Sequence, residues 1–284
     1  KIVIRYIGIM LCAFLTISGC NSDSLSEGEA RSALKLYVFD CGMLRYKSIE
    51  SFAISDDETD IRDLIVPCYV VEHGNGRLLW DGGLPSKLAD IDGWQGEGSL
   101  SRLDRTLSDQ LSGVGLDMSS FDYVAFSHMH FDHVGVANEI DGATLIIQKP
   151  EYEVAFAGGP GVEQYQTALF ENLKDAERIV IDGDYDVFGD GRVRIISAPG
   201  HTPGHQVLLI DLANTGPIML SGDLYHFAIT REKRRVPSFN FDRDMTLNSM
   251  EHIEKLIEDI GAAFWIEHEL AFFEQLNKAP AFYD

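Results

Sequence analysis

The chain has 284 residues, 45% of them hydrophobic, and a formal net charge of −22 at pH 7. An acidic body does not attract the phosphate backbone of a nucleic acid, so we expect no nucleic-acid partner. Neither low-complexity segments nor tandem repeats occur, and the length suits one large core or two fused halves.

The N-terminus has the order of an export signal. Lys1 and Arg5 precede an apolar stretch over residues 6–15, and small residues follow up to Cys20. This order is typical of a secretory signal peptide, and the stretch is shorter than the roughly 20 apolar residues of a membrane-spanning helix. We therefore predict a signal peptide over residues 1–19.

Ile17-Ser18-Gly19-Cys20 resembles the lipobox of bacterial lipoproteins, in which cleavage precedes a cysteine that is then acylated. Residues 20–33 are polar and without periodicity, which predicts a flexible tether. We expect an exported lipoprotein that a lipid anchor on Cys20 attaches to a membrane. In a Gram-negative cell, Asn21 favours the periplasmic face of the outer membrane. The alternatives are an uncleaved anchor and simple secretion.

Residues 34–284 mix strand-like and helix-like patterns and are expected to form one domain. Short apolar runs predict strands near residues 34–40, 65–71, 77–81, 122–127, 143–148, 193–197, 206–211, 217–221 and 262–267. Apolar residues at three- and four-residue spacing predict helices near residues 99–111, 165–176 and 245–260. This mixture predicts an α+β fold in which helices cover sheets, a layered αββα sandwich.

Cys41 and Cys68 lie beside the first two predicted strands. An exported protein can oxidise such a pair to a disulfide. The interpretation that we favour is two buried thiols that pack as small apolar groups.

The most informative segment, residues 128–133, reads His-Met-His-Phe-Asp-His and directly follows a predicted strand. Side chains two positions apart share a face of an extended backbone, so His128 and His130 can bind one cation together. A turn would then bring Asp132 and His133 to a second cation. Imidazole and carboxylate ligands suit zinc or a similar first-row metal.

Three further candidate ligands follow predicted strands downstream. His201 lies among glycines after residues 193–197, Asp223 ends an apolar run, and His268 follows the last predicted strand. A single such residue is usually a surface or capping residue. Several ligand-bearing strand ends in one chain instead predict that these loops converge on one metal site.

With these residues in place, the chain resembles the metallo-β-lactamase superfamily. Its ligand series is His-x-His-x-Asp-His, then Gly-His-Thr-x-Gly-His, then Ser-Gly-Asp, then a late His. Within it, the nearest resemblance is to the N-acyl-homoserine lactonases, the quorum-quenching lactonases, to which Trp80-Asp81-Gly82-Gly83 and residues 236–242 also correspond. The resemblance runs from about Leu34 to the C-terminus. It implies a metallo-β-lactamase-like αββα sandwich over residues 34–284.

The resemblance also implies a centre of two divalent metal ions, with zinc the expected metal. The implied ligands are His128, His130 and His201 for one ion, Asp132, His133 and His268 for the other, and Asp223 as the bridge. We expect His205 and Asp81 to orient these ligands through hydrogen bonds. Asp132 is also expected to carry a proton to the leaving group.

One position departs from the family. Three residues after the bridging aspartate, related lactonases usually carry a tyrosine whose hydroxyl approaches the substrate carbonyl. Here His226 occupies that position and Tyr225 precedes it. Either side chain can donate a hydrogen bond to the developing oxyanion; by position we favour His226, and ordinary packing is the alternative for both.

The implied activity is that of a hydrolase that opens the lactone ring of N-acyl-homoserine lactones by attack of a metal-bridging hydroxide. The alternatives on the same scaffold are a glyoxalase-II-like thioesterase, an arylesterase or phosphotriesterase, and a β-lactamase. A non-catalytic surface lipoprotein is a third class. Phe156, Phe239 and Phe241 are candidates for an apolar groove that binds the acyl tail of this small-molecule substrate.

The only strongly basic run is residues 231–235. We interpret it as a solvated face of a helix or loop. The alternatives are a lid contact and an oligomer interface, which keeps a homodimer among the expectations.

Overall fold

The computed structural model describes residues 34–284. The signal peptide and the tether that the sequence predicts, residues 1–19 and 20–33, lie outside the described residues. Within the described part of the chain, no helix is long and apolar enough to cross a membrane.

The first sheet has eight strands, and the order along its main path is β13-β1-β2-β3-β5-β6-β7, with β4 paired to β1. Its N-terminal half is antiparallel, whereas β3, β5, β6 and β7 run parallel to one another. The strands are β1 Lys35–Arg45, β2 Asp63–His73, β3 Gly76–Trp80, β4 Leu100–Arg102, β5 Tyr123–Ala125, β6 Thr144–Gln148, β7 Arg178–Ile181 and β13 Phe282–Tyr283.

The second sheet has five strands in the order β12-β11-β10-β9-β8. Its pairs are antiparallel except β11 with β12, which are parallel. The strands are β8 Tyr185–Asp186, β9 Val193–Ser197, β10 Gln206–Leu212, β11 Gly216–Leu220 and β12 Ala263–Trp265.

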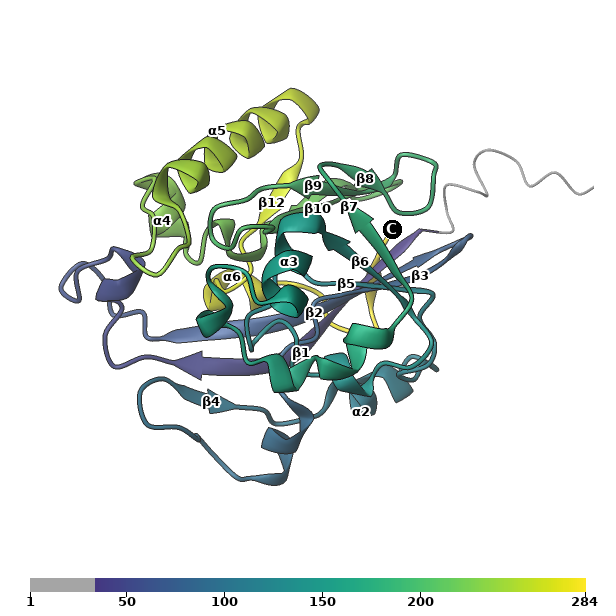
Figure 1. Ribbon diagram of the computed structural model, residues 1–284, viewed down its shortest axis with the longest axis horizontal. Helices are drawn as coiled ribbons and strands as arrows, with labels where there is room; N and C mark the ends of the chain where they lie inside the picture. The colour runs from purple at the N-terminus through teal and green to yellow at the C-terminus, as the bar shows by residue number, and fades with distance from the viewer. Residues whose placement is uncertain (1–33) are drawn as a thin grey trace, which may run out of the picture.

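Helices cover the outer faces of both sheets, and Figure 1 shows the strands lying between α5 at the top and α2 at the bottom. The α-helices are α2 Leu107–Ser112, α3 Lys149–Ala157, α4 Ala228–Glu232, α5 Arg243–Ile260 and α6 Leu270–Phe273. Short 3₁₀ turns span Glu50–Phe52, Ser86–Asp90, Ala137–Glu139, Val162–Gln164, Thr167–Leu169, Glu171–Asp175 and Gly222–Leu224.

The layers follow from the two-residue period of the strands. Along β1, Leu36 and Val38 point into the core between the sheets, whereas Tyr37 and Phe39 point into the outer core. Successive side chains of a strand face opposite sides of the sheet, so a strand that is apolar at every position is buried on both faces. The predicted αββα sandwich is confirmed.

Helix α5 closes the second sheet because its sequence fixes both its ends and its buried face. The side chain of Asp242 accepts a hydrogen bond from the backbone N of Met245 at 2.7 Å, and Gly261 ends the helix in a left-handed conformation with φ of 67°. Met250, Ile253 and Ile257 lie on its buried face. An N-cap of this kind stabilises a helix by about 1 kcal/mol.

The nine predicted strands are all present, and so is the predicted helix near residues 245–260. The prediction of a helix over 99–111 was wrong in its first half, because the helix begins only after Thr106, whose Oγ1 caps the N of Asp109 at 3.0 Å. The helix predicted over 165–176 is a series of 3₁₀ turns that pack Phe170 and Leu173 into the outer core. Helix α3 was missed.

Cys41 and Cys68 form a disulfide between β1 and β2, so the favoured interpretation of two free thiols was wrong. The register of β1 against β2 shifts after Asp40, and this irregularity brings the two Cα atoms to 5.8 Å. The disulfide lies next to the loop after β3, because Leu84 donates a backbone hydrogen bond to the Cys41 carbonyl at 3.1 Å.

Loss of this disulfide should destabilise the protein without removing the fold. The bond joins cysteines 27 positions apart and restricts the unfolded chain, so the double variant Cys41→Ala/Cys68→Ala should lose about 2–4 kcal/mol of unfolding free energy in urea. Alkylation of the denatured protein before reduction should label neither cysteine, whereas two buried free thiols would both be labelled once the chain is unfolded. Labelling of both cysteines, together with unchanged stability of the variant, would contradict the bond.

Candidate metal centre

The predicted ligands lie in four loops at one end of the two sheets. Residues 127–133 follow β5, residues 198–205 follow β9, the turn Gly222–Leu224 follows β11, and His268 follows β12. Each loop therefore begins at the carboxyl end of a strand, where loops commonly place functional side chains on a rigid scaffold. Apart from His130, which is half-buried, all the predicted ligands are buried.

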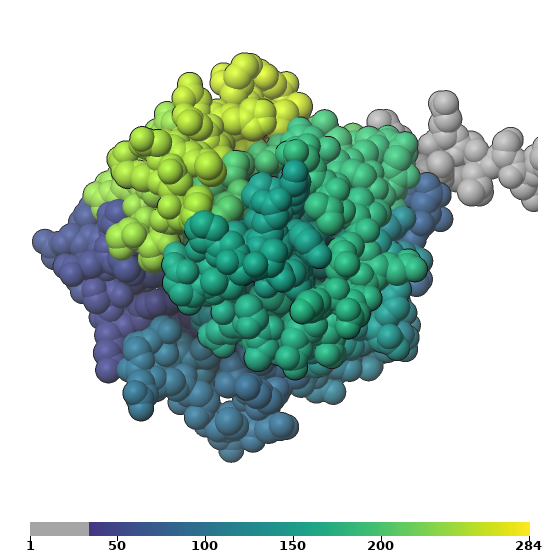
Figure 2. Space-filling model, in the orientation of Figure 1, coloured from purple at the N-terminus to yellow at the C-terminus, as the bar shows by residue number. Residues whose placement is uncertain are grey.

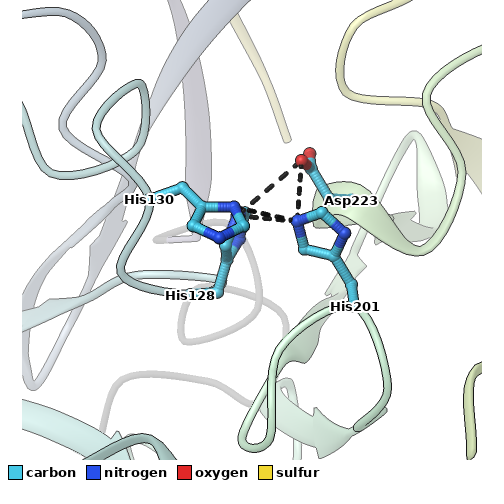
Figure 3. Close-up of side chains that lie close together, drawn as sticks. All are labelled: His128, His130, His201 and Asp223. Atoms are coloured by element: carbon cyan, nitrogen blue, oxygen red, sulfur yellow. Dashed lines mark hydrogen bonds and ion pairs between the residues drawn. The ribbon is translucent and has the colours of Figure 1, made fainter. Parts of the chain in front are cut away.

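The first cluster consists of His128, His130, His201 and Asp223, whose side chains point toward one another in Figure 3. His128 Nε2 lies 2.8 Å from His130 Nδ1, and His201 Nε2 lies 3.1 Å from both of these nitrogens. Asp223 Oδ2 lies 3.2 Å from His201 Nε2 and 3.7 Å from His128 Nε2.

This arrangement fits a cation. Burial lowers the pKa of His128 and of His130 well below the usual histidine value, so both imidazoles are neutral. Each neutral imidazole has one nitrogen with a lone pair, and here the nitrogens of three rings face the same small space beside a carboxylate oxygen. A divalent cation is the group that such converging donors bind.

The second cluster consists of Asp132, His133 and His268, and it shares Asp223 with the first. Asp223 Oδ1 lies 2.9 Å from His268 Nε2 and 3.3 Å from His133 Nε2. Burial lowers the pKa of His268, but Asp223 and Asp132 outweigh it and raise that pKa to about 9. The two oxygens of Asp223 thus face different clusters, as expected of a bridging residue.

Asp81 and His205 orient the ligands, as the sequence predicted. Asp81 accepts a hydrogen bond from the backbone N of Ser127 at 2.7 Å, and its other oxygen lies 3.2 Å from His133 Nδ1. His205 donates through Nδ1 to the Ala198 carbonyl at 2.9 Å and accepts from the backbone N of Asp223 at 2.9 Å. Hydrogen bonds of this kind fix which nitrogen of a histidine faces the metal.

Two other orienting groups were not predicted, although one of them lies in the stretch 236–242 that resembles the lactonases. Asn240 Oδ1 lies 3.0 Å from His201 Nδ1, and the Ile65 carbonyl accepts from His268 Nδ1 at 2.7 Å. Asn240 precedes α5 and Ile65 is near the start of β2, so both reach the centre only through tertiary packing.

A pocket of about 240 Å³ lies over the two clusters. Its lining residues are Tyr46, Ser51, Phe52, Leu64, His130, Phe131, Asp132, Gln164, Asp223, His226, Phe239 and His268. Figure 2 shows a hollow on this face where the purple segment near residue 50, the teal segment near residue 160 and the yellow-green region of α4 and α5 meet.

Of the three phenylalanines predicted to form an apolar groove, only Phe239 lines this pocket. Phe156 packs against Phe170 in the outer core with ring centroids 5.5 Å apart, and Phe241 is exposed beside Gly161. Phe52 was missed, although its ring contacts Phe239 and His226 with centroids 5.2 Å and 4.9 Å away.

The structure separates His226 from Tyr225. His226 lines the pocket, and its Nε2 lies 3.0 Å from Asp223 Oδ2. Tyr225 points to the other side, where its ring lies 5.9 Å from that of Phe264 under α5, and it does not line this pocket. Tyr225 has an extended backbone, and consecutive side chains of such a segment face opposite ways.

The basic run over residues 231–235 forms ion pairs within the chain. Arg231 pairs with Glu254 at 2.8 Å, and Lys233 and Arg235 both pair with Glu58 at 2.6 Å. These partly exposed pairs join the α4 region to α5 and to the loop between β1 and β2, and solvent screening keeps their contribution to stability small.

Comparison with known proteins agrees with this architecture. A model of the metallo-beta-lactamase superfamily matches residues 61–260. An N-acyl homoserine lactonase of Bacillus sp. is 32% identical over 248 residues, which cover 83% of this chain and 93% of that protein. The N-acyl homoserine lactonase AttM of Rhizobium radiobacter is 30% identical over 270 residues, which cover 88% and 98%.

Among solved structures, an N-acyl homoserine lactone hydrolase with the product N-hexanoyl-L-homoserine bound at its catalytic metal centre superposes with a TM-score of 0.74. It is 26% identical, and the match covers 87% of this chain and 98% of that one. The residues that the family model matches include six of the seven predicted ligands, and His268 lies beyond them. The chain therefore belongs to the metallo-β-lactamase superfamily and, within it, to the N-acyl homoserine lactonase family of metal-dependent hydrolases that act on ester bonds.

Proposed function

We propose that this protein opens the lactone ring of N-acyl homoserine lactones by hydrolysis, the reaction of a quorum-quenching enzyme. The observation that carries the proposal is the pair of buried ligand clusters that share Asp223 beneath an aromatic-walled pocket. Two relatives are N-acyl homoserine lactonases, and a similar structure holds the product at its metal centre. The acidic surface also suits an uncharged small substrate.

We assign one divalent cation to each cluster, with zinc as the expected metal. When bound, such cations supply a hydroxide nucleophile at neutral pH and polarise the ester carbonyl. Asp223 sets the spacing of the two clusters, since each of its oxygens belongs to one of them. Asp132 lines the pocket with a side chain that is 10% exposed, and it is the carboxylate placed to carry a proton to the leaving alkoxide.

His226 provides a polar group on an otherwise largely aromatic wall. Its ring lies between Phe52 and His268, with centroids 4.9 Å and 5.6 Å away. We propose that an N–H of His226, whose Nε2 lies 3.0 Å from Asp223 Oδ2, donates to the carbonyl oxygen of a bound substrate, since preorganised donors stabilise a developing oxyanion. Phe52 and Phe239 then offer apolar contacts to the acyl tail, each buried methylene of which contributes about 0.8 kcal/mol.

A substrate panel tests the proposed reaction. Purified protein should hydrolyse homoserine lactones of several tail lengths with a higher kcat/KM than thioesters, aryl esters, phosphotriesters or a cephalosporin. Dialysis against a chelator should abolish turnover, and zinc should restore it at two ions per chain. A higher kcat/KM for any other substrate class, or full activity with one ion per chain, would contradict the proposal.

Separate replacements test the assignment of His226. His226→Ala should lower kcat by about 100-fold, as expected for the loss of one oxyanion donor. Tyr225→Phe should leave kcat within about twofold, since the ring faces α5. Zinc content checks that both variants retain the centre. Equal activity of the two variants would reject the assignment.

We also propose that the protein is an exported lipoprotein anchored through Cys20. The support is the order of residues 1–20, a basic start, an apolar stretch and a lipobox-like end. Acyl chains attached there hold a protein on a membrane surface without spanning it.

Replacement of the acylated cysteine tests the anchor. In bacterial cells that express the full chain, Cys20→Ser should move the protein from the membrane fraction to the soluble fraction, with Cys12→Ser as the matched control that stays on membranes. Detergent-free fractionation followed by immunoblotting measures the distribution. Retention of the Cys20→Ser protein on membranes would refute the anchor.

A further inference from the structure

A buried carboxylate outside the predicted motifs connects two of the metal-binding loops. Glu151 lies in the first turn of α3 and is 2% exposed. One of its oxygens accepts hydrogen bonds from the backbone N of Met129 at 2.9 Å and from the Tyr165 hydroxyl at 2.6 Å. The other accepts from Thr202 Oγ1 at 2.8 Å and from the backbone N of Gly204 at 2.9 Å.

These four donors are placed next to the first cluster. Met129 lies between His128 and His130, and Thr202 directly follows His201. The ring of Tyr165 packs edge-on against that of His130, with centroids 5.7 Å apart. A single carboxylate therefore links the loop after β5 to the loop after β9, and both loops carry imidazoles of the same cluster.

The surrounding structure is built to hold this carboxylate. A Cβ atom at position 204 would lie 2.5 Å from both the backbone N and the Cβ of Glu151, so only glycine permits the loop to approach α3 so closely. The positive end of the helix dipole and four donors favour the ionised carboxylate. An acid buried without such partners would be costly, which makes a role in mere packing a poor explanation of Glu151.

The second cluster is oriented by other groups. His133 is held by Asp81, and His268 by the Ile65 carbonyl, and neither group contacts Glu151 in the structure. Ser127 joins the two clusters, since its Oγ lies 3.1 Å from both His128 Nδ1 and His133 Nδ1, but the hydrogen bonds of Glu151 reach only residues in the sequence neighbourhood of His128, His130 and His201 and the ring that packs on His130.

We propose that Glu151 is a positioning residue that holds the loops after β5 and β9 together, so that the imidazoles of the first cluster stay close to one another. It therefore governs the affinity of that cluster alone for its metal ion. The inference rests on the proposed function only in that the first cluster binds a cation. It does not depend on the identity of the substrate.

Zinc affinity of purified full-length protein tests this inference without any substrate. Competition with a chromogenic chelator should resolve two binding events in the wild type. Glu151→Gln keeps the size of the side chain, but its one acceptor oxygen can serve only one of the two pairs of donors, and its amide N–H groups face the other pair. One event should therefore weaken by about 10–100-fold while the other stays within twofold. Asp81→Asn should weaken the other event, and the double variant both.

Matched variants separate positioning from damage to the fold. Glu153→Gln changes an exposed glutamate of the same helix and should retain both wild-type affinities. Thr202→Val and Tyr165→Phe each remove one of the four donors and should weaken the same binding event as Glu151→Gln, to a smaller extent. If Glu151→Gln does not fold, these two variants test the role of Glu151 in its place. Cobalt spectra should report altered geometry in the weakened site only.

The outcomes that overturn the inference are distinct from those that overturn the function. Two unchanged zinc affinities in Glu151→Gln, equal weakening of both, or a wild type that binds fewer than two zinc ions would each reject the role of Glu151. A wild type that binds two zinc ions but does not open lactones would reject the proposed substrate and leave the role of Glu151 in place.

Discussion

The carboxylate of Asp223 lies between two groups of buried imidazoles, and the rest of the site depends on its placement. Its two oxygens face different clusters, and its backbone N donates to His205, so the residue is fixed from both ends. The preceding Gly222 has φ of 46°, and a Cβ there would lie 2.7 Å from Ser127 Cβ and His205 Nε2. Because Ser127 and His205 lie so close to the backbone of Gly222, only glycine fits at this position.

The two sheets make this placement possible because each ligand loop starts from the carboxyl end of a buried strand. Strands that are apolar on both faces are held by the core between the sheets and by the helix layers, so their ends have little freedom. The hydrogen bonds of Asp81, Asn240, Glu151 and the Ile65 carbonyl then fix the loops against those strands. The loops that carry the candidate ligands are therefore held both by the buried strands from which they start and by these hydrogen bonds.

The structure differs from the predictions at features that depend on tertiary packing and not on a local sequence pattern. The helix predicted over residues 165–176 was inferred from apolar spacing, but 3₁₀ turns also bring Phe170 and Leu173 into the core. The disulfide depends on a shift in the register of β1 against β2, which no local pattern records. Tyr225 and His226 are adjacent and both can donate hydrogen bonds, and only the backbone direction after β11 decides which side chain enters the pocket.

The sequence by itself predicted nine strands, helix α5, the layered fold and the candidate ligand residues, because metal coordination and strand burial restrict residue type at short, regular spacings. Tertiary structure alone placed Glu151, Asn240 and the Ile65 carbonyl beside those residues. Glu151 and Asn240 lie 22 and 39 positions from the residues that they bind, Met129 and His201. A hydrogen bond across such a separation leaves no periodic trace in the chain, since it depends on where two independently packed segments meet.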